Sequence, residues 1–94
     1  MVTAIVLVKA RRRSVNETAE ALLMVPGVTE VHSVAGEHDL VAIVRLRTHE
    51  ELADVVTSKM HKIEGIEGTS TLVSFKSLSK FDIDKIFLGD AVKK

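Results

Sequence analysis

Two short polar clusters are the parts of this sequence best suited to binding a small molecule. The first is Gly36-Glu37-His38-Asp39, in which a glycine and a carboxylate stand where a tight turn is expected. The second is Thr69-Ser70-Thr71, which offers hydroxyl and backbone groups at the start of a strand. The exposed N–H groups of a turn, together with a carboxylate, complement the two charged ends of an amino acid. The alternative is structural: Gly36 and Asp39 shape a hairpin, and the Thr/Ser run is ordinary strand.

The histidines and the other carboxylates form no pattern typical of a metal centre or an enzyme. A metal needs three or four converging ligands, and the sequence has neither a His-x-x-x-His pair nor a cysteine. It also lacks a nucleophile-elbow motif and a glycine-rich phosphate loop. Paired carboxylates, such as Glu50 with Glu51 and Asp82 with Asp84, are explained by helix capping and solvation. We therefore expect no enzymatic activity, no metal and no cofactor. The four histidines are His32, His38, His49 and His61.

The run Arg11-Arg12-Arg13 is strongly basic, but the chain as a whole is balanced. Thirteen basic residues face thirteen acidic ones, so the formal net charge is zero. No aromatic residue adjoins the run to stack on nucleic-acid bases. We expect a solvated loop, or a contact with an acidic neighbouring subunit, and no direct binding of nucleic acid.

Length and composition indicate one globular domain. The chain has 94 residues, of which 46% are hydrophobic and 28% charged, and it has no cysteine. The apolar stretch 2–8 is too short to span a bilayer, and it lacks the features of a signal peptide. We expect a cytoplasmic protein that does not bind membranes.

The second half of the chain repeats the pattern of the first. In each half an apolar strand leads to a Ser/Thr-x-x-Glu helix start, an amphipathic helix, a stop that contains glycine, and another strand. The first helix is expected from Ser14, with Glu17 completing a capping box, and the second from Thr48 with Glu51. A split β-α-β unit written twice predicts an α+β, ferredoxin-like βαββαβ fold. Its four-stranded antiparallel sheet carries two helices on one face.

The expected strands are 2–8, 28–35, 40–46 and 69–75, and the first helix ends at Pro26-Gly27. Gly36-Glu37 suits a two-residue type II′ turn between the second and third strands. The domain is expected to cover 1–76. Residues 77–94 form an extension with a short amphipathic helix over 81–88, stopped by Gly89. The apolar stripes predicted for the two helices are Val15, Ala19, Leu22 and Leu23, and Leu52, Val55, Val56, Met60 and Ile63.

The first and third strands are apolar on both faces, although two helices cover only one face of such a sheet. One set of alternate residues is Ala4, Val6 and Val8 with Leu40, Ala42 and Val44; the other is Ile5 and Leu7 with Val41 and Ile43. One set must face the uncovered side, where a large apolar patch is unusual for a monomer. We predict a homodimer that pairs sheet to sheet. The alternative is that the C-terminal segment folds over its own sheet.

Several of these motifs together resemble the effector-binding domain of the leucine-responsive/asparagine regulator (Lrp/AsnC) family, the regulation-of-amino-acid-metabolism (RAM) domain. The resemblance runs from Val2 to Phe75. It includes the apolar opening strand, the segment VPGVTEVHSVAGEHDLVAIV at 25–44, and IEGIEGTSTLVSF at 63–75. The Gly-x-x-Asp hairpin followed by an apolar strand, and the Thr-Ser-Thr ahead of the last strand, are specific in combination. Family members usually carry an N-terminal helix-turn-helix, so this chain is expected to be a stand-alone form.

The resemblance implies sheet-paired dimers that assemble into an octamer or a similar ring, with amino-acid effectors bound between dimers. By position, the implied effector-binding residues are Gly36, Glu37, His38, Asp39, Thr69, Ser70 and Thr71. It further implies an indirect effect on transcription, exerted by mixing with full-length regulators of the family. Two alternatives stay open: a dimeric α+β-barrel enzyme of the monooxygenase type, and an oligomerisation module without a ligand.

Overall fold

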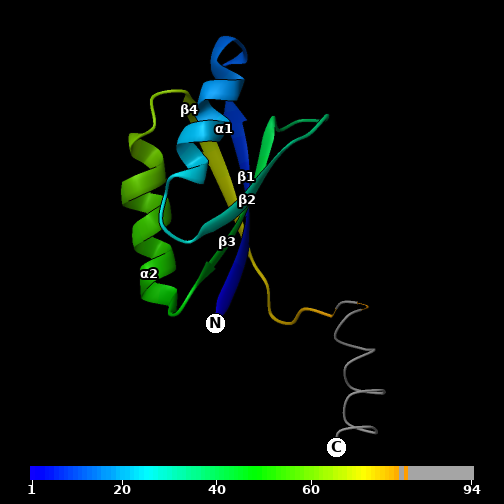
Figure 1. Ribbon diagram of the computed structural model, residues 1–94, viewed down its shortest axis with the longest axis vertical. Helices are drawn as coiled ribbons and strands as arrows, with labels where there is room; N and C mark the ends of the chain where they lie inside the picture. The colour runs from blue at the N-terminus through cyan, green and yellow to red at the C-terminus, as the bar shows by residue number, and fades with distance from the viewer. Residues whose placement is uncertain (79, 81–94) are drawn as a thin grey trace, which may run out of the picture.

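The computed structural model describes residues 1–78 and 80. Four strands and two helices follow one another in the order βαββαβ (Figure 1). Short helical turns, Arg12–Ser14, Val55–Lys59 and Met60–Lys62, adjoin the helices. The predicted helix over 81–88 lies outside the described residues, and the boundary at residue 76 stays a prediction. The elements are β1 Val2–Ala10, α1 Val15–Leu23, β2 Val28–Ser33, β3 Leu40–Leu46, α2 His49–Asp54 and β4 Ile66–Val73.

The sheet is antiparallel with the strand order β2-β3-β1-β4, which places β1 and β3 at its centre. In β1, Ile5 lies opposite Ile43 of β3 and Leu72 of β4. Directly opposed residues share a face of the sheet, so this register sorts the side chains of all three strands. The predicted α+β fold with four antiparallel strands is confirmed.

The hydrophobic core lies between the sheet and the two helices, which cover the same face (Figure 1). On the sheet side, six core residues of β1 and β3 have no exposed surface, and Ala10 at the end of β1 is also buried; the six are Ala4, Val6, Val8, Leu40, Ala42 and Val44. The second helical segment contributes Leu52, Val55 and Met60, as its spacing predicts, while Val56 and Ile63 pack beside them. The division of the two-faced strands into a covered and an uncovered set is therefore confirmed.

The start of α1 differs from the prediction. Ser14 makes no side-chain capping bond, because a 3₁₀ turn over Arg12–Ser14 precedes the helix and leaves Ser14 at φ −124°, ψ 27°. That backbone is not the extended one in which a capping hydroxyl reaches the next turn. The predicted stripe was also wrong at Leu23, which is 51% exposed. Thr18 is buried instead, because it stands one turn before Leu22 on the same side of the helix.

Two loop boundaries also differ. The β2–β3 connection spans residues 34–39, not a two-residue turn, because Asp39 N–H donates to the Val8 carbonyl (2.9 Å) and holds the loop against β1. Strand β4 begins at Ile66, three residues earlier than predicted, because β1 continues to Ala10 and pairs with it there. It also ends at Val73 rather than Phe75.

The capping box of α2 is confirmed. Thr48 Oγ1 accepts a hydrogen bond from the Glu51 N–H (3.1 Å), and the Glu51 carboxylate accepts one from the Thr48 N–H (3.3 Å). The two N–H groups would otherwise lack partners in the helix. This box fixes where the second helical segment begins.

Replacing each predicted capping residue by alanine should therefore have unequal effects. Thr48→Ala removes an acceptor from the helix start and should lower the free energy of unfolding by about 1 kcal/mol. Ser14→Ala removes no capping bond and should lower it by less than about half of that amount. Urea denaturation of the two variants measures both values. If both variants lost the same free energy of unfolding, the conclusion that Thr48 caps its helix and Ser14 does not would be wrong.

Candidate functional site

The loop 34–39 is fastened to the end of β1 by three hydrogen bonds. Besides the Asp39 N–H, the Asp39 carboxylate takes part, because its Oδ2 accepts from the Ala10 N–H at 2.8 Å. The Lys9 ammonium donates to the Glu37 carbonyl at 2.7 Å. Contacts with β1 therefore hold the hairpin in place, in addition to the bond from the Val34 N–H to the Asp39 carbonyl across its own ends (3.0 Å).

Gly36 supplies the backbone conformation that this loop requires. Its φ is +141°, which L side chains rarely adopt, and open space surrounds the position that a Cβ would take. Gly36 and Glu37 are exposed, whereas His38 and Asp39 are half-buried. The loop thus presents backbone groups and the Glu37 carboxylate at the surface, while the Asp39 carboxylate is partly covered.

The second polar cluster lies in β4, on the other side of β1. Thr69 is opposite Val8 and Thr71 is opposite Val6, so both threonines face the helices. Ser70 is opposite Leu7 and faces the uncovered side. The three hydroxyls therefore do not share one face. Thr69 Oγ1 lies 3.4 Å from His61 Nε2, beside a small cavity of about 110 Å³ lined by His61, Ile66, Glu67 and Gly68.

The fold brings the two predicted clusters to the same end of the sheet without joining them. Val8 is paired with Leu40, next to Asp39, on one side and with Thr69 on the other. Neighbouring strands lie about 4.8 Å apart, so roughly two strand spacings separate the clusters within one chain. One chain alone brings the carboxylate and the hydroxyls near each other but does not enclose a ligand between them.

The uncovered face of the sheet has an apolar centre. Ile5, Leu7, Val41 and Ile43 are half-buried there, and Leu72 is 52% exposed. Beyond the central strands, Phe75 is fully exposed and Leu78 is 68% exposed, and the chain leads away from the sheet after β4 (Figure 1). The described part of the C-terminal segment therefore does not cover the apolar centre of the sheet.

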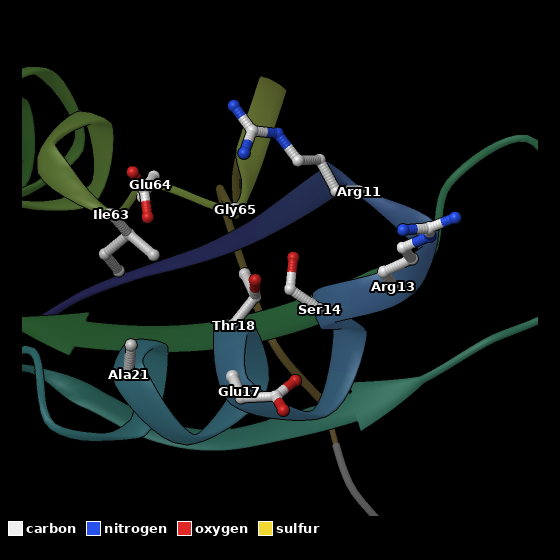
Figure 2. Close-up of a pocket in the computed structure, with 9 residues that line it drawn as sticks. All are labelled: Arg11, Arg13, Ser14, Glu17, Thr18, Ala21, Ile63, Glu64 and Gly65. Carbon is white, nitrogen blue, oxygen red and sulfur yellow. The ribbon is translucent and has the colours of Figure 1, made fainter.

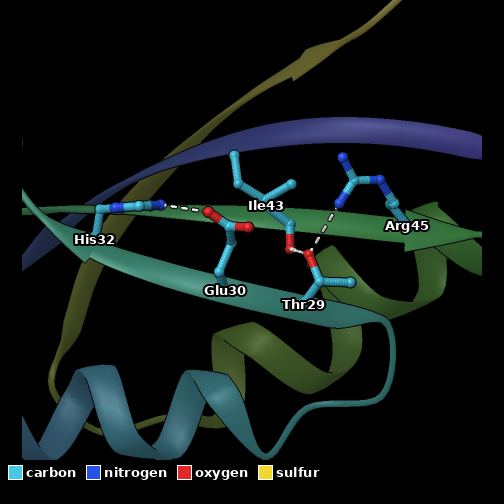
Figure 3. A network of polar contacts seen from close by, with 5 residues as sticks. All are labelled: Thr29, Glu30, His32, Ile43 and Arg45. Atoms are coloured by element: carbon cyan, nitrogen blue, oxygen red, sulfur yellow. Dashed lines mark hydrogen bonds and ion pairs between the residues drawn. The ribbon is translucent and has the colours of Figure 1, made fainter. Parts of the chain in front are cut away.

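Polar contacts border the apolar centre on the β2 side (Figure 3). His32 Nε2 and Glu30 Oε1 are 2.6 Å apart, and the Arg45 guanidinium donates to Thr29 Oγ1 at 3.2 Å. Thr29 in turn donates to the Ile43 carbonyl. An apolar centre with a polar margin is the anatomy of a protein–protein interface.

A larger cavity, of about 450 Å³, lies between α1 and the loop before β4 (Figure 2). It is lined by Arg11, Arg13 and Thr18, among others, but by none of the seven predicted effector-binding residues. The sequence offered one signal for it, since Thr18 stands at helical spacing between Val15 and Leu22 and so breaks an apolar stripe with a hydroxyl.

Two further findings concern the part of the chain that the structure describes. Within residues 1–78 and 80, no cluster of three or more His, Asp or Glu side chains could hold a metal ion. No helix in this part is long and apolar enough to cross a membrane.

Comparison with known proteins identifies similar domains. The sequence model of the Lrp/AsnC ligand binding domain matches residues 3–82. TTHA0845 from Thermus thermophilus is 46% identical with a TM-score of 0.79, over 85% of this chain and 100% of that one. The hypothetical protein PHS023 from Pyrococcus horikoshii is 35% identical with a TM-score of 0.75, over 82% and 93% of the two chains.

An uncharacterised HTH-type transcriptional regulator of Pyrococcus horikoshii is 44% identical over 64 residues, which is 68% of this chain and 43% of that protein. The chain thus spans less than half the length of this curated relative. The regulatory protein Rv3291c from M. tuberculosis, solved in complex with L-methionine, shares the fold at 20% identity and a TM-score of 0.72, over 85% and 54% of the two chains.

The hydrogen bond from the Ala10 N–H to the Asp39 carboxylate allows a test of how much this carboxylate stabilises the fold. Asp39→Ala leaves the half-buried Ala10 N–H without its acceptor and should lower the free energy of unfolding by about 1–3 kcal/mol. Asp39→Asn keeps a carbonyl oxygen at the same place, so it should lower it by less than about 1 kcal/mol. Thermal and urea unfolding of the pair measures the difference. Identical losses would show that the hydrogen bond does not support the hairpin.

Proposed function

Because the chain belongs to the Lrp/AsnC ligand-binding domain family, we propose that it binds a small amino-acid-like effector between dimers. Through that binding it modulates transcription indirectly. The observation that carries the proposal is the family match over residues 3–82. The solved Rv3291c complex adds that a protein of this fold binds L-methionine.

The proposed dimer joins the uncovered faces of two sheets. Ile5 and Ile43 stand opposite each other at the centre of that face, and Leu72 extends the patch onto β4. Each buried square ångström of such surface contributes about 25 cal/mol. The Glu30–His32 and Arg45–Thr29 contacts would form the polar margin of the interface. Further assembly of dimers, into an octamer or similar ring, belongs to the same proposal.

The proposed effector site uses the two polar clusters at the end of β1. Asp39 Oδ2 is engaged by the Ala10 N–H, so Oδ1 is the oxygen offered to the ammonium group of a ligand. The N–H groups of the Gly36–His38 turn, with hydroxyls of the 69–71 segment, would take the ligand's carboxylate. The clusters are separated within one chain, so a neighbouring dimer would complete the enclosure.

The proposed mechanism is thermodynamic linkage. A ligand held between dimers stabilises the assembly that binds it best, because its binding free energy adds to that of the assembly. A change of assembly would alter transcription through full-length regulators of the family that share the oligomer. The HTH-type regulators among the relatives are the kind of partner that this requires.

A thermal-shift screen of the common amino acids, with L-methionine among them, tests the effector. At a concentration about 100 times its dissociation constant, a true effector adds about 2.7 kcal/mol and raises Tm by roughly 10–20 °C. Asp39→Asn should keep the unliganded Tm near that of the wild type and lose most of the shift. A flat screen of the wild-type chain would instead support a module that oligomerises without a ligand. An undiminished shift in Asp39→Asn would exclude Asp39 from the site.

A further inference from the structure

The cavity beside α1 has features that packing alone does not explain. It occupies about 450 Å³ between the Arg11–Ser14 turn, the first half of α1 and the loop that leads into β4 (Figure 2). That volume lies in the range of small-molecule sites. The Arg11 N–H closes one end by donating to the Gly65 carbonyl at 2.9 Å.

Thr18 is the first of these features. Its side chain lines the cavity and is only 2% exposed, yet its hydroxyl forms no hydrogen bond with any described residue. A buried hydroxyl without a partner costs about 1–3 kcal/mol, and native proteins retain few of them. The Thr18 hydroxyl is therefore a polar group without a partner at the wall of this cavity.

Gly65 lets the backbone pass close to that hydroxyl. A Cβ at this position would collide with Thr18 Oγ1 and lie 3.0 Å from Ser14 Oγ. Since Gly65 has no positive φ to explain the glycine, the close approach is what requires it. The Ser14 hydroxyl caps no helix, so it is a second donor beside the cavity. Figure 2 shows the Ser14 hydroxyl, from the turn before α1, and the Thr18 hydroxyl, from α1 itself, pointing toward the side where Gly65 lies.

Charges of both signs surround these hydroxyls without neutralising one another. Arg11, Arg13, Glu17 and Glu64 all line the cavity, and none of the four is within 4.0 Å of an opposite charge among the described residues. In Figure 2, Arg13 lies on one side of the two hydroxyls and Glu64 on the other, with Arg11 above them. The Ile63 and Ala21 side chains add apolar surface near the Glu64 side.

We propose that this cavity is a second binding site, contained within one protomer, for a small zwitterion of the amino-acid type. The ligand's carboxylate lies between Arg11 and Arg13 and accepts hydrogen bonds from Ser14 and Thr18. Its ammonium group faces Glu64, and its aliphatic part contacts Ile63. A simple anion would satisfy the arginines but would meet Glu17 and Glu64, so a molecule with both charges fits better. The site needs no neighbouring subunit and does not depend on the proposed function.

The arginine run provides a matched pair of variants. Arg12 and Arg13 are adjacent and exposed, but only Arg13 lines the cavity. Each change to glutamine removes the same charge. Amide NMR titrations measure the affinity of the protein for the zwitterions glycine, β-alanine and 4-aminobutyrate. Acetate and ethylammonium, which each carry only one of the two charges, serve as controls. We expect shifts at residues 11–18 and 64–65, with at least one zwitterion binding about tenfold more tightly than acetate. Arg13→Gln should weaken that binding about tenfold, and Arg12→Gln less than about twofold.

Thr18→Val tests the buried hydroxyl separately. The valine methyl replaces a hydroxyl that has no partner, so the unliganded Tm should stay equal or rise, while zwitterion binding falls about tenfold. Thr18→Ser keeps the hydroxyl and should keep the binding. Asp39→Asn, which disables only the proposed hairpin site, should leave these titrations unchanged. The proposal is overturned if acetate binds as well as every zwitterion. It is equally overturned if Arg12→Gln matches Arg13→Gln, or if shifts occur only at residues 36–39.

Discussion

The rest of this structure depends on the position of β1 at the centre of the sheet. Its inward side chains Val6 and Val8 are fully buried beneath the helices, and its outward ones, Ile5 and Leu7, form the middle of the uncovered face. Its end also holds the loops. Val8 and Ala10 bind Asp39 of the hairpin, and the next N–H, from Arg11, binds Gly65 before β4. One strand therefore sets the core, the open face and the place of every polar group considered for ligand binding.

This arrangement has a consequence for regulation. The consecutive amides of Ala10 and Arg11 are held by the hairpin carboxylate and by the loop that closes the cavity beside α1. The proposed effector site between dimers and the proposed site within a protomer thus adjoin two consecutive peptide units, which meet at the Cα of Ala10. Ligand binding at one site that shifts this backbone segment would alter the other, and such coupling is reciprocal in free energy. The fold provides the connection because β1 ends between the two loops.

Much of the fold could be predicted from the sequence because the signals are local. The apolar runs of β1 and β3, the Thr48–Glu51 box and the stripe through Leu52, Val55 and Met60 each depend on near neighbours in sequence. The failures depend on distant contacts. The hairpin is longer than predicted because Asp39 binds β1, and β4 begins earlier because Ala10 needs a partner. Thr18 was the one local signal of the cavity beside α1; the position of that cavity could not be predicted, since it requires Gly65 to pass directly over Thr18.

In the proposed dimer, the uncovered face of the sheet pairs with a second copy of the chain. Sedimentation equilibrium at low micromolar concentration tests this pairing, with Leu72→Lys as a variant that places a charge on the β4 side of the apolar patch. We expect the wild-type chain to sediment as a dimer or a multiple of dimers, and the variant to shift toward monomer with its helices intact by circular dichroism. A wild-type chain that sediments as a monodisperse monomer would exclude the sheet-to-sheet dimer, and with it any ligand site between dimers.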